Sequence, residues 1–348
     1  MNILSIISGK NDGCSYYRIT VPSKYINNKE IKIEPYLCHI NKFSSSPVKF
    51  KNRAAQRLNG AVWDRLKWLN RLPLLYKQGS YDFLWINRSL LNFRNSIDAS
   101  IKNPIYDFDD AVWLSDARHC FKEYCSKAAV VLAGNNFLYE EAKKYSNRIE
   151  IIPTPVDTLH YTKLPSNKDT FNVGWIGSAA GYHYLAGIEQ QLLRFFSKHK
   201  DARLRIVSER YPHELTGLKP YIDFFPWSRE RDVELINTFS VGIMPIKNTI
   251  WDLGKCSFKM LQYMACEVPV IASNIGMNEE VGNLMSDSGE FGTMITNDNQ
   301  WPDALENYYQ KHLDDLEHYG ESGRKIVNLH YSAMIISKKI EAAFNKYL

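Results

Sequence analysis

The sequence lacks several features that would assign it to a protein class directly. Its six cysteines, at positions 14, 38, 120, 125, 256 and 266, form no CxxC pair and no zinc-type spacing, so we expect free thiols in a reducing compartment. No apolar run approaches the roughly 20 residues that a membrane-spanning helix needs. The opening stretch, MNILSIISG, is too short for a signal peptide and lacks its basic start. We therefore expect a cytoplasmic protein, soluble or peripheral on the inner face of the membrane.

The sequence does contain enough apolar material for two packed domains. Of its 348 residues, 45% are hydrophobic and 13% are aromatic, which excludes a disordered chain. Apolar runs with the length of buried strands alternate with helical patterns, and a polar stretch at 161–170 separates them into two series. This alternation predicts an α/β fold in which each series forms a parallel sheet covered by helices.

Residues 41–79 form the most basic part of the chain. They hold nine basic residues and a single acid, Asp64, and their apolar residues recur at helical spacing. This pattern predicts a basic amphipathic helix that docks on an anionic membrane; a nucleic-acid backbone and an ordinary solvated helix face are the alternatives. The candidate acceptor or membrane contacts are Arg53, Arg57, Trp63, Arg65, Lys67, Trp68 and Arg71.

The segment 254–276, GKCSFKMLQYMACEVPVIASNIG, has the pattern of a ligand-binding half-site. Residues 256–266 suit a helix with Lys255, Lys259 and Gln262 on its polar side, and 269–273 suit a buried strand. Gly276 falls in the turn after that strand. A helix that leads into a parallel strand and then into a polar turn forms one side of a crevice in open α/β sheets.

This segment resembles the donor-site signature of GT-B glycosyltransferases, in particular the group-4-like retaining enzymes of bacterial polysaccharide and lipopolysaccharide biosynthesis. The stretches GCSYYRITVPSKYI, IYDFDDAVW and IIPTPVD are similar to the same group. The resemblance implies two Rossmann-like domains with a cleft between them: an acceptor-binding domain over 1–160 with the basic insert 41–79, and a nucleotide-sugar-binding domain over 161–329. A helix over 330–348 is expected to return to the first domain.

The resemblance also implies the activity and its site. A sugar would pass from a nucleotide-diphosphate sugar to a glycan or lipid-linked acceptor, with no metal and no other cofactor. The family's two glutamates fall on Gly254 and Gln262, and the Arg and Lys expected after the strand at 171–177 are absent, so we expect Lys255 and Lys259 to bind the diphosphate. The full set of expected donor contacts is Gly13, Gly177, Ser178, Lys255, Lys259, Gln262, Asn274, Gly276, Asn278 and Glu279.

Three acids, Asp107, Asp109 and Asp110, admit several interpretations. Asp109 falls where the family often has a histidine, so we expect it, with Lys259, to be catalytic, as a general base or a stabiliser of the oxocarbenium ion. Asp110 is a candidate helix cap. Asp107 and Asp109 also form the Asp-x-Asp metal motif of the other large glycosyltransferase fold, against which the second α/β series argues. A nucleic-acid glycosyltransferase, a sugar-nucleotide epimerase and a non-catalytic sugar-nucleotide-binding subunit stay open as alternative functions.

Overall fold

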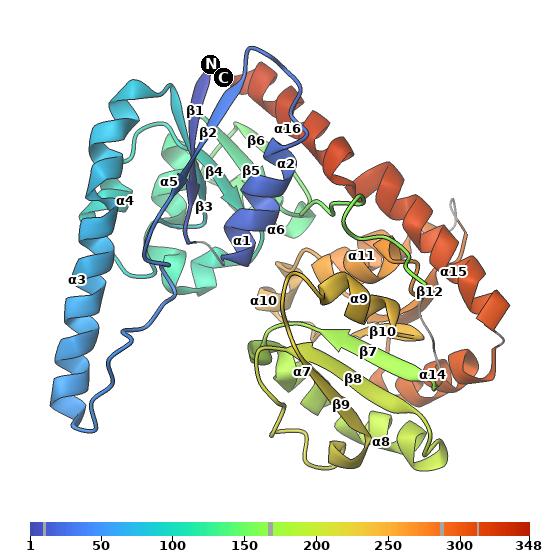
Figure 1. Cartoon of the computed structure of the whole chain (residues 1–348). Helices are drawn as coiled ribbons and strands as arrows, with labels where there is room; N and C mark the ends of the chain where they lie inside the picture. Colours follow the sequence, from blue (N-terminus) through green and yellow to red (C-terminus); the bar gives the residue numbers. More distant parts are fainter. Residues whose placement is uncertain (10–11, 166–169, 286–288, 312) are drawn as a thin grey trace. The chain divides into compact units, whose positions relative to one another are not determined.

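The computed structural model describes residues 1–348 except 10–11, 166–169, 286–288 and 312. The chain forms two compact units, Met1–Pro155 together with Ile336–Leu348, and Val156–Ile335. Each unit is built on a six-stranded sheet with helices around it (Figure 1). The predicted α/β class is confirmed. The sequence placed the divisions at 160 and 330, and residues 166–169 of the predicted linker lie outside the described residues.

All strand pairs in the first unit are parallel, in the order β2-β1-β3-β4-β5-β6. The strands β3, β4 and β5 are almost entirely buried, which explains their continuous apolar composition. The strands are β1 Asn2–Ile7, β2 Lys32–Leu37, β3 Phe83–Asn87, β4 Ile105–Phe108, β5 Val130–Ala133 and β6 Ile149–Ile151.

The helices of the first unit differ greatly in length. The longest, α3, has 25 residues and stands at the outer side of this unit, with the chain that precedes it running alongside (Figure 1). The helices are α1 Gly13–Ser15, a π-helical turn Tyr16–Thr20, α2 Val21–Ser23, α3 Arg53–Lys77, α4 Ser96–Ser100, α5 Phe121–Lys127 and α6 Asn136–Ala142. Short 3₁₀ turns cover Gln78–Ser80, Val112–Leu114 and Asp116–His119.

The last helix, α16 (Ala333–Tyr347), supplies part of the core of the first unit. Its side chains Ile336, Ile340 and Phe344 are fully buried there, and the ring of Phe344 meets Trp85 edge to face at 5.5 Å. Both chain ends pack against this core and lie side by side (Figure 1). The return of the last helix to the first unit, expected from the family resemblance, is thus present.

The second unit has the strand order β12-β11-β10-β7-β8-β9, again with all pairs parallel. The strands are β7 Asn172–Ile176, β8 Arg203–Ser208, β9 Ile222–Pro226, β10 Val241–Met244, β11 Val270–Ser273 and β12 Gly292–Ile295. The strand β12 was not predicted from the sequence. Its residues, GTMI, are only partly buried and carry a weak strand pattern.

The helices of the second unit surround this sheet. They are α7 Tyr182–Gly187, α8 Glu189–Lys198, α9 Asp232–Asn237, α10 Ile250–Leu253, α11 Phe258–Ala265, α12 Met277–Gly282, α14 Trp301–Gln310, α15 Leu313–Ile326 and a π-helical turn Val327–Tyr331. Short 3₁₀ turns cover Ala179–Gly181, Lys219–Tyr221 and Asp298–Gln300.

Each sheet has one point at which the strand order reverses. In the second unit the chain moves from β7 outward to β8 and β9 and then returns to β10 on the other side of β7. The strand order therefore reverses between β7 and β10, and the loops that follow these strands diverge there. In the first unit the same reversal falls between β1 and β3. Such reversal points, at the carboxyl ends of the strands, are where open α/β sheets bind ligands.

Candidate functional site

In the second unit, Gly177 and Lys259 meet just beyond the end of β7. A Cβ atom on Gly177 would stand only 2.4 Å from Cε of Lys259, so the lysine stem passes directly over the glycine. The Lys259 ammonium lies 5.7 Å from the centre of the Trp175 ring, a cation–π distance. The absence of a side chain at Gly177 therefore makes room for the cation at the reversal point of the sheet.

Lys255 approaches the same loop from a different direction. Its ammonium lies 5.7 Å from the Tyr184 ring and 5.6 Å from the Trp251 ring. The sequence predicted one helix over 256–266 that would carry both lysines, but this boundary is wrong. Ser257 has a left-handed backbone (φ 51°), so α11 begins at Phe258 and Lys255 lies in the connection from α10. Both cations nevertheless lie beside the segment between Trp175 and Tyr184.

The loop that holds the start of α11 is fixed by Asn278. The Ser257 hydroxyl donates to Asn278 Oδ1 at 2.6 Å, and Asn278 Nδ2 donates to the Ser273 carbonyl at 3.1 Å. Asn278 is fully buried, so its amide joins the end of β11 to the start of α11. We expected Asn278 to contact the donor, and the structure gives it this positioning role. Gly276 has φ +57°, a conformation that favours glycine.

Gln262 is the second predicted donor contact that the structure reassigns. Its side chain is 5% exposed, and its Nε2 donates to the Tyr161 hydroxyl at 2.7 Å. That hydroxyl in turn donates to Asp232 Oδ2 at 2.7 Å. The Gln262 amide, expected to contact the donor, is therefore engaged in a buried network that ties α11 to α9 and to the segment before β7.

One of the two family glutamates falls on Gly254, which has no carboxylate, and the nearby Asp252 does not take its place. Gly254 follows α10, and Asp252 within that helix is buried. The Asp252 carboxylate accepts a short hydrogen bond from the Tyr184 hydroxyl and one of 2.7 Å from the Thr249 hydroxyl. Asp252 thus holds α10 against α7, and its oxygens are already hydrogen-bonded within the unit.

The remaining predicted donor contacts occupy exposed or half-buried positions in loops and short helices. Ser178 is exposed directly after Gly177, Asn274 follows β11 and donates its backbone N–H to the Ile295 carbonyl at 2.7 Å, and Glu279 is exposed on α12. In the first unit, Gly13 begins α1, where an added Cβ would make only ordinary contact with Tyr17 at 3.8 Å. Packing alone therefore does not require glycine at position 13.

Two polar residues at the same edge of the second sheet were missed by sequence reasoning. Glu209 follows β8, and its Oε1 accepts a hydrogen bond of 2.9 Å from the backbone N–H of Ala179. Lys247 follows β10, and its Cε would lie 3.2 Å from a Cβ on Gly187 in α7. Their positions just after apolar strands were a usable signal, because parallel strands end at a common edge.

In the first unit, Asp109 is ion-paired. Arg88 donates to Asp109 Oδ1 from Nη2 at 2.8 Å and from Nε at 3.1 Å, and it makes a short contact with Asp110. Burial acts to raise the pKa of Asp109, but the charges of Arg88 and Arg18 outweigh it and hold the pKa below its usual value. A carboxylate with a lowered pKa is a weak general base. Of the two predicted roles, the anionic stabiliser fits this environment.

Asp107 belongs to a different, fully buried pair. Its Oδ1 accepts from Arg18 Nε at 2.8 Å and from Asn87 Nδ2 at 3.2 Å, and the side chains of Asp107 and Arg18 are both inaccessible. Asp107 and Asp109 are therefore paired with different arginines, although residues two apart on a strand share one face, because Asp109 lies beyond the end of β4. The Asp-x-Asp metal interpretation is not supported by this arrangement.

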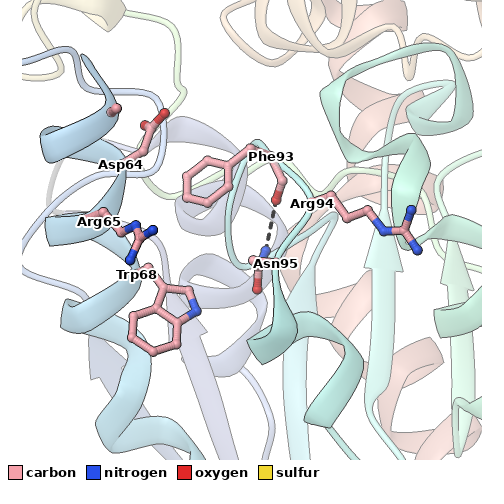
Figure 2. Close-up of a pocket in the computed structure, with 7 residues that line it drawn as sticks. Asp64, Arg65, Trp68, Phe93, Arg94 and Asn95 are labelled. Atoms are coloured by element: carbon pink, nitrogen blue, oxygen red, sulfur yellow. Dashed lines mark hydrogen bonds between the residues drawn. The ribbon is translucent and has the colours of Figure 1, made fainter. Parts of the chain in front are cut away.

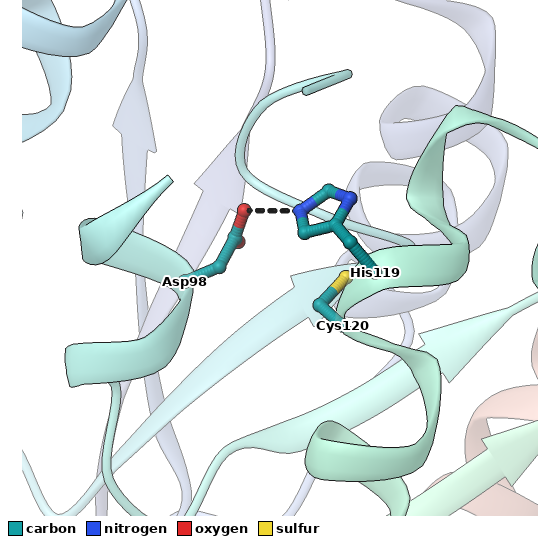
Figure 3. A group of neighbouring side chains, drawn as sticks. All are labelled: Asp98, His119 and Cys120. Carbon is teal, nitrogen blue, oxygen red and sulfur yellow. Dashed lines mark hydrogen bonds and ion pairs between the residues drawn. The ribbon is translucent and has the colours of Figure 1, made fainter. Parts of the chain in front are cut away.

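One group of three metal-capable side chains occurs among the described residues. It consists of Asp98, His119 and Cys120, whose ligand atoms lie within 4.8 Å of one another (Figure 3). The Asp98 carboxylate already accepts hydrogen bonds from Leu90 N–H (2.9 Å) and the Tyr124 hydroxyl (2.6 Å). Burial also raises the pKa of the Cys120 thiol, which disfavours the thiolate that a metal would bind. The group fits a structural network better than a metal site.

Part of the basic face that the sequence predicted for α3 is turned toward its own unit. Lys67 and Arg71 are buried, and Arg71 donates to the carbonyls of Leu90 and Ser8, both at 3.3 Å. The Trp63 indole N–H donates to the Ser44 carbonyl at 3.0 Å. Arg71 and Trp63, two of the predicted acceptor or membrane contacts, therefore attach α3 to its own unit, while the buried Lys67 pairs with Asp64 of the same helix at 3.3 Å. The sequence prediction placed Arg71 on the exposed surface. A long cationic side chain can also be buried when it donates hydrogen bonds to backbone carbonyls, as Arg71 does.

The outward face of α3 carries a row of apolar side chains. Five of its large apolar side chains are between 41% and 88% exposed, and we call them the α3 stripe: Leu58, Val62, Leu66, Leu69 and Tyr76. The predicted contacts Arg53, Arg57 and Arg65 are exposed on the same helix, and Trp68 is half-buried. Among the described residues, no helix is both long and apolar enough to span a membrane.

Comparisons with known proteins agree with this architecture. Residues 170–315 match the family model "Glycosyl transferases group 1", whereas a search of curated proteins found no match. The fold is similar to that of sucrose-phosphate synthase from Thermosynechococcus elongatus, with a TM-score of 0.69 and 12% identity over 99% of this chain and 98% of the other. HepE of Anabaena, in complex with UDP and glucose, gives a TM-score of 0.68 and 14% identity over 99% of both chains. A glycosyltransferase from Rickettsia africae gives 0.65 and 16%, over 99% and 98%.

Proposed function

We propose that this chain, which has the fold of the GT-B glycosyltransferases and matches their group 1 family model over residues 170–315, transfers a sugar from a nucleotide-diphosphate sugar to a glycan or lipid-linked glycan acceptor. The observation that carries the proposal is the placement of Lys259 over Gly177, with Lys255 beside the same loop. A departing nucleotide diphosphate accumulates negative charge, and fixed cations at that position stabilise the transition state.

The two lysines also support a reaction without a metal ion. Their ammonium groups lie near aromatic rings at the carboxyl edge of the second sheet, where they would neutralise the diphosphate that the family otherwise binds with an Arg and a Lys. Asp109, held as an anion by Arg88, would stabilise the positive charge that develops on the sugar. Retention of configuration is proposed from the family resemblance. Activity that persists in excess EDTA is the expected result.

The α3 stripe supports peripheral docking on an anionic membrane, where a lipid-linked acceptor of polysaccharide or lipopolysaccharide assembly would be found. Leu58, Val62 and Leu69 are each more than half exposed, with Arg53, Arg57 and Arg65 on the same helix. Each basic residue near an anionic surface contributes about 1 kcal/mol of binding free energy. The α3 stripe would enter the headgroup region, while the buried Arg71 holds the helix to the unit.

The test begins with donor binding. A nucleotide sugar that binds the folded chain raises its melting temperature by mass action, so a thermal-shift screen of nucleotide sugars identifies the donor. UDP-sugars are the first to test because the HepE structure contains UDP and glucose. The expected second result is release of the nucleotide diphosphate that increases when glycan acceptors are added. A chain that neither binds nor cleaves any nucleotide sugar would overturn the proposal.

The same assay separates the alternative functions. A sugar-nucleotide epimerase would convert the donor sugar, and its nucleotide release would not depend on acceptor. A non-catalytic subunit would bind the donor without releasing nucleotide. A nucleic-acid glycosyltransferase would respond to oligonucleotides and not to glycans.

A further inference from the structure

A pocket of about 380 Å³ opens in the first unit between α3 and the chain before α4. It is lined by Ala61, Asp64, Arg65 and Trp68 of α3 and by Phe93, Arg94 and Asn95. Figure 2 shows the Phe93 ring on one side and the Asp64, Arg65 and Trp68 side chains on the other, while the Arg94 side chain extends away from them. The volume lies at the lower end of the roughly 300–1,000 Å³ found for small-molecule sites.

The wall formed by residues 93–95 is held in place by Asn95. Its Oδ1 accepts the backbone N–H groups of Ile97 and Asp98, both at 2.9 Å, and so caps α4. Its Nδ2 donates to the Phe93 carbonyl at 2.9 Å and to Asp98 Oδ2 at 2.6 Å. Because every polar atom of this amide is used, the backbone that carries Phe93 is fixed. The side chain of Asn95 therefore shapes the pocket without being available to a ligand.

The opposite wall is fixed through the buried face of α3. Arg71 bridges the helix to the carbonyls of Leu90 and Ser8, and the Trp68 indole N–H lies 3.4 Å from the Ser96 hydroxyl. A pocket whose two walls are held independently is formed before a ligand arrives, which lowers the ordering cost of binding.

The chemistry of the lining favours a sugar ring with a negative charge. Trp68 and Phe93 supply two aromatic faces, on which the apolar face of a pyranose can pack. Arg65 supplies an exposed guanidinium, which matches a carboxylate or phosphate with paired hydrogen bonds. The one acid, Asp64, accepts a hydrogen bond of 3.3 Å from the buried Lys67, so its charge is partly neutralised within the helix.

We propose that the pocket between α3 and residues 93–95 binds an acidic saccharide, with its ring against Trp68 and Phe93 and its carboxylate or phosphate on Arg65. This inference rests on the proposed function, because it gives the acceptor a chemical class: a glycan that contains a uronate or a phosphate-substituted sugar. The pocket would hold one residue of that glycan and orient the chain. It is a binding subsite for the acceptor and takes no part in bond cleavage.

Direct binding tests the proposal on the full chain. The probes are a hyaluronan tetrasaccharide, which carries carboxylates, glucose 6-phosphate, which carries a phosphate, and the neutral chitotetraose. Saturation-transfer NMR and tryptophan fluorescence report binding. We expect at least one acidic probe to bind, and Arg65→Ala to weaken it about 10- to 100-fold, as loss of a charge-assisted hydrogen bond does. Arg65→Lys should lose less, and Trp68→Ala and Phe93→Ala should each weaken it.

Arg148→Ala is the matched control, because Arg148 is an exposed arginine of the same unit that does not line the pocket. Equal effects of Arg65→Ala and Arg148→Ala, tighter binding of the neutral probe, or no binding of either acidic probe would overturn the pocket assignment.

Donor binding distinguishes this failure from that of the proposed function. If nucleotide sugars bind and are cleaved while the acidic probes fail, the pocket assignment alone is wrong. If acidic probes bind in an Arg65-dependent way and no nucleotide sugar binds, the transferase proposal alone is wrong.

Discussion

The contact between Gly177 and Lys259 allows a sharp test of the donor site. In Gly177→Ala the new Cβ would stand 2.4 Å from Lys259 Cε and 2.9 Å from the buried Trp175 ring. Trp175 is 1% exposed and packed on all sides, whereas the lysine stem is flexible. We therefore expect the lysine to move away from the end of β7. The change should cost about 1–3 kcal/mol of unfolding free energy through overpacking.

The catalytic consequence should be larger than the loss of stability. If Lys259 stabilises the departing diphosphate, its displacement removes one preorganised charge, and we expect kcat to fall about 100-fold. The assay is acceptor-dependent release of nucleotide diphosphate, with the donor found in the thermal-shift screen. Lys259→Ala should produce a similar loss. The double variant should be no worse than Lys259→Ala alone, because both changes remove the same interaction.

Gly181→Ala is the matched control for this experiment. Its new Cβ would stand 3.0 Å from the same Trp175 ring, and the lysine is not among its near contacts. Gly181→Ala should therefore lose a similar amount of unfolding free energy and keep most of the acceptor-dependent release of nucleotide diphosphate. Equal losses in Gly177→Ala and Gly181→Ala would show that the activity depends on Trp175 packing, and additive losses in the double variant would refute the role of Lys259.

Four further results are expected. Leu66→Asp combined with Leu69→Asp should abolish sedimentation with anionic vesicles and leave the melting temperature within about 2 °C, because both side chains are exposed; retained sedimentation would contradict the docking face. Since the pKa of Asp109 is lowered in the folded state, its stabilising effect is complete above the unfolded pKa of about 3.9 and is lost as pH falls through the folded pKa. Asp109→Asn should therefore lower the melting temperature at pH 7 and flatten its decline below pH 4, and an unchanged pH profile would count against the ion pair. Gly276→Ala should cost about 1–2 kcal/mol of unfolding free energy from its positive φ, measured by urea titration. Cys14, whose pKa burial raises to about 12, should react with thiol reagents at pH 8 far more slowly than a free cysteine.

The strands were the most predictable part of the fold. Buried parallel strands such as β5 and β11 are continuous apolar runs with no competing interpretation, and their ends mark the loops that matter. Helix boundaries were less predictable. Ser257 has a left-handed backbone that nothing in the amphipathic pattern reveals, and its hydroxyl is hydrogen-bonded to Asn278, 21 residues further along the chain.

The orientation of α3 could not be derived from its composition. Periodicity shows that a helix has two faces, but it does not show which face is covered. Here the carbonyls of Leu90 and Ser8 accept hydrogen bonds from Arg71, so this cation points inward while the α3 stripe points outward. The same limit applied to Gln262 and Asp109. Their sequence positions were those of site residues, yet Tyr161 and Arg88, both distant in sequence, occupy their polar groups.

The membership of α16 in the first unit has a consequence for biosynthesis. The hydrophobic core around Trp85 is closed by Ile336, Ile340 and Phe344, which leave the ribosome only after the whole second unit has been translated. During synthesis, the part of this core that α16 covers therefore stays exposed until residues 336–348 have been made. Such a nascent chain is a natural client for chaperones, and pauses in translation before residue 336 would prolong its exposure to aggregation.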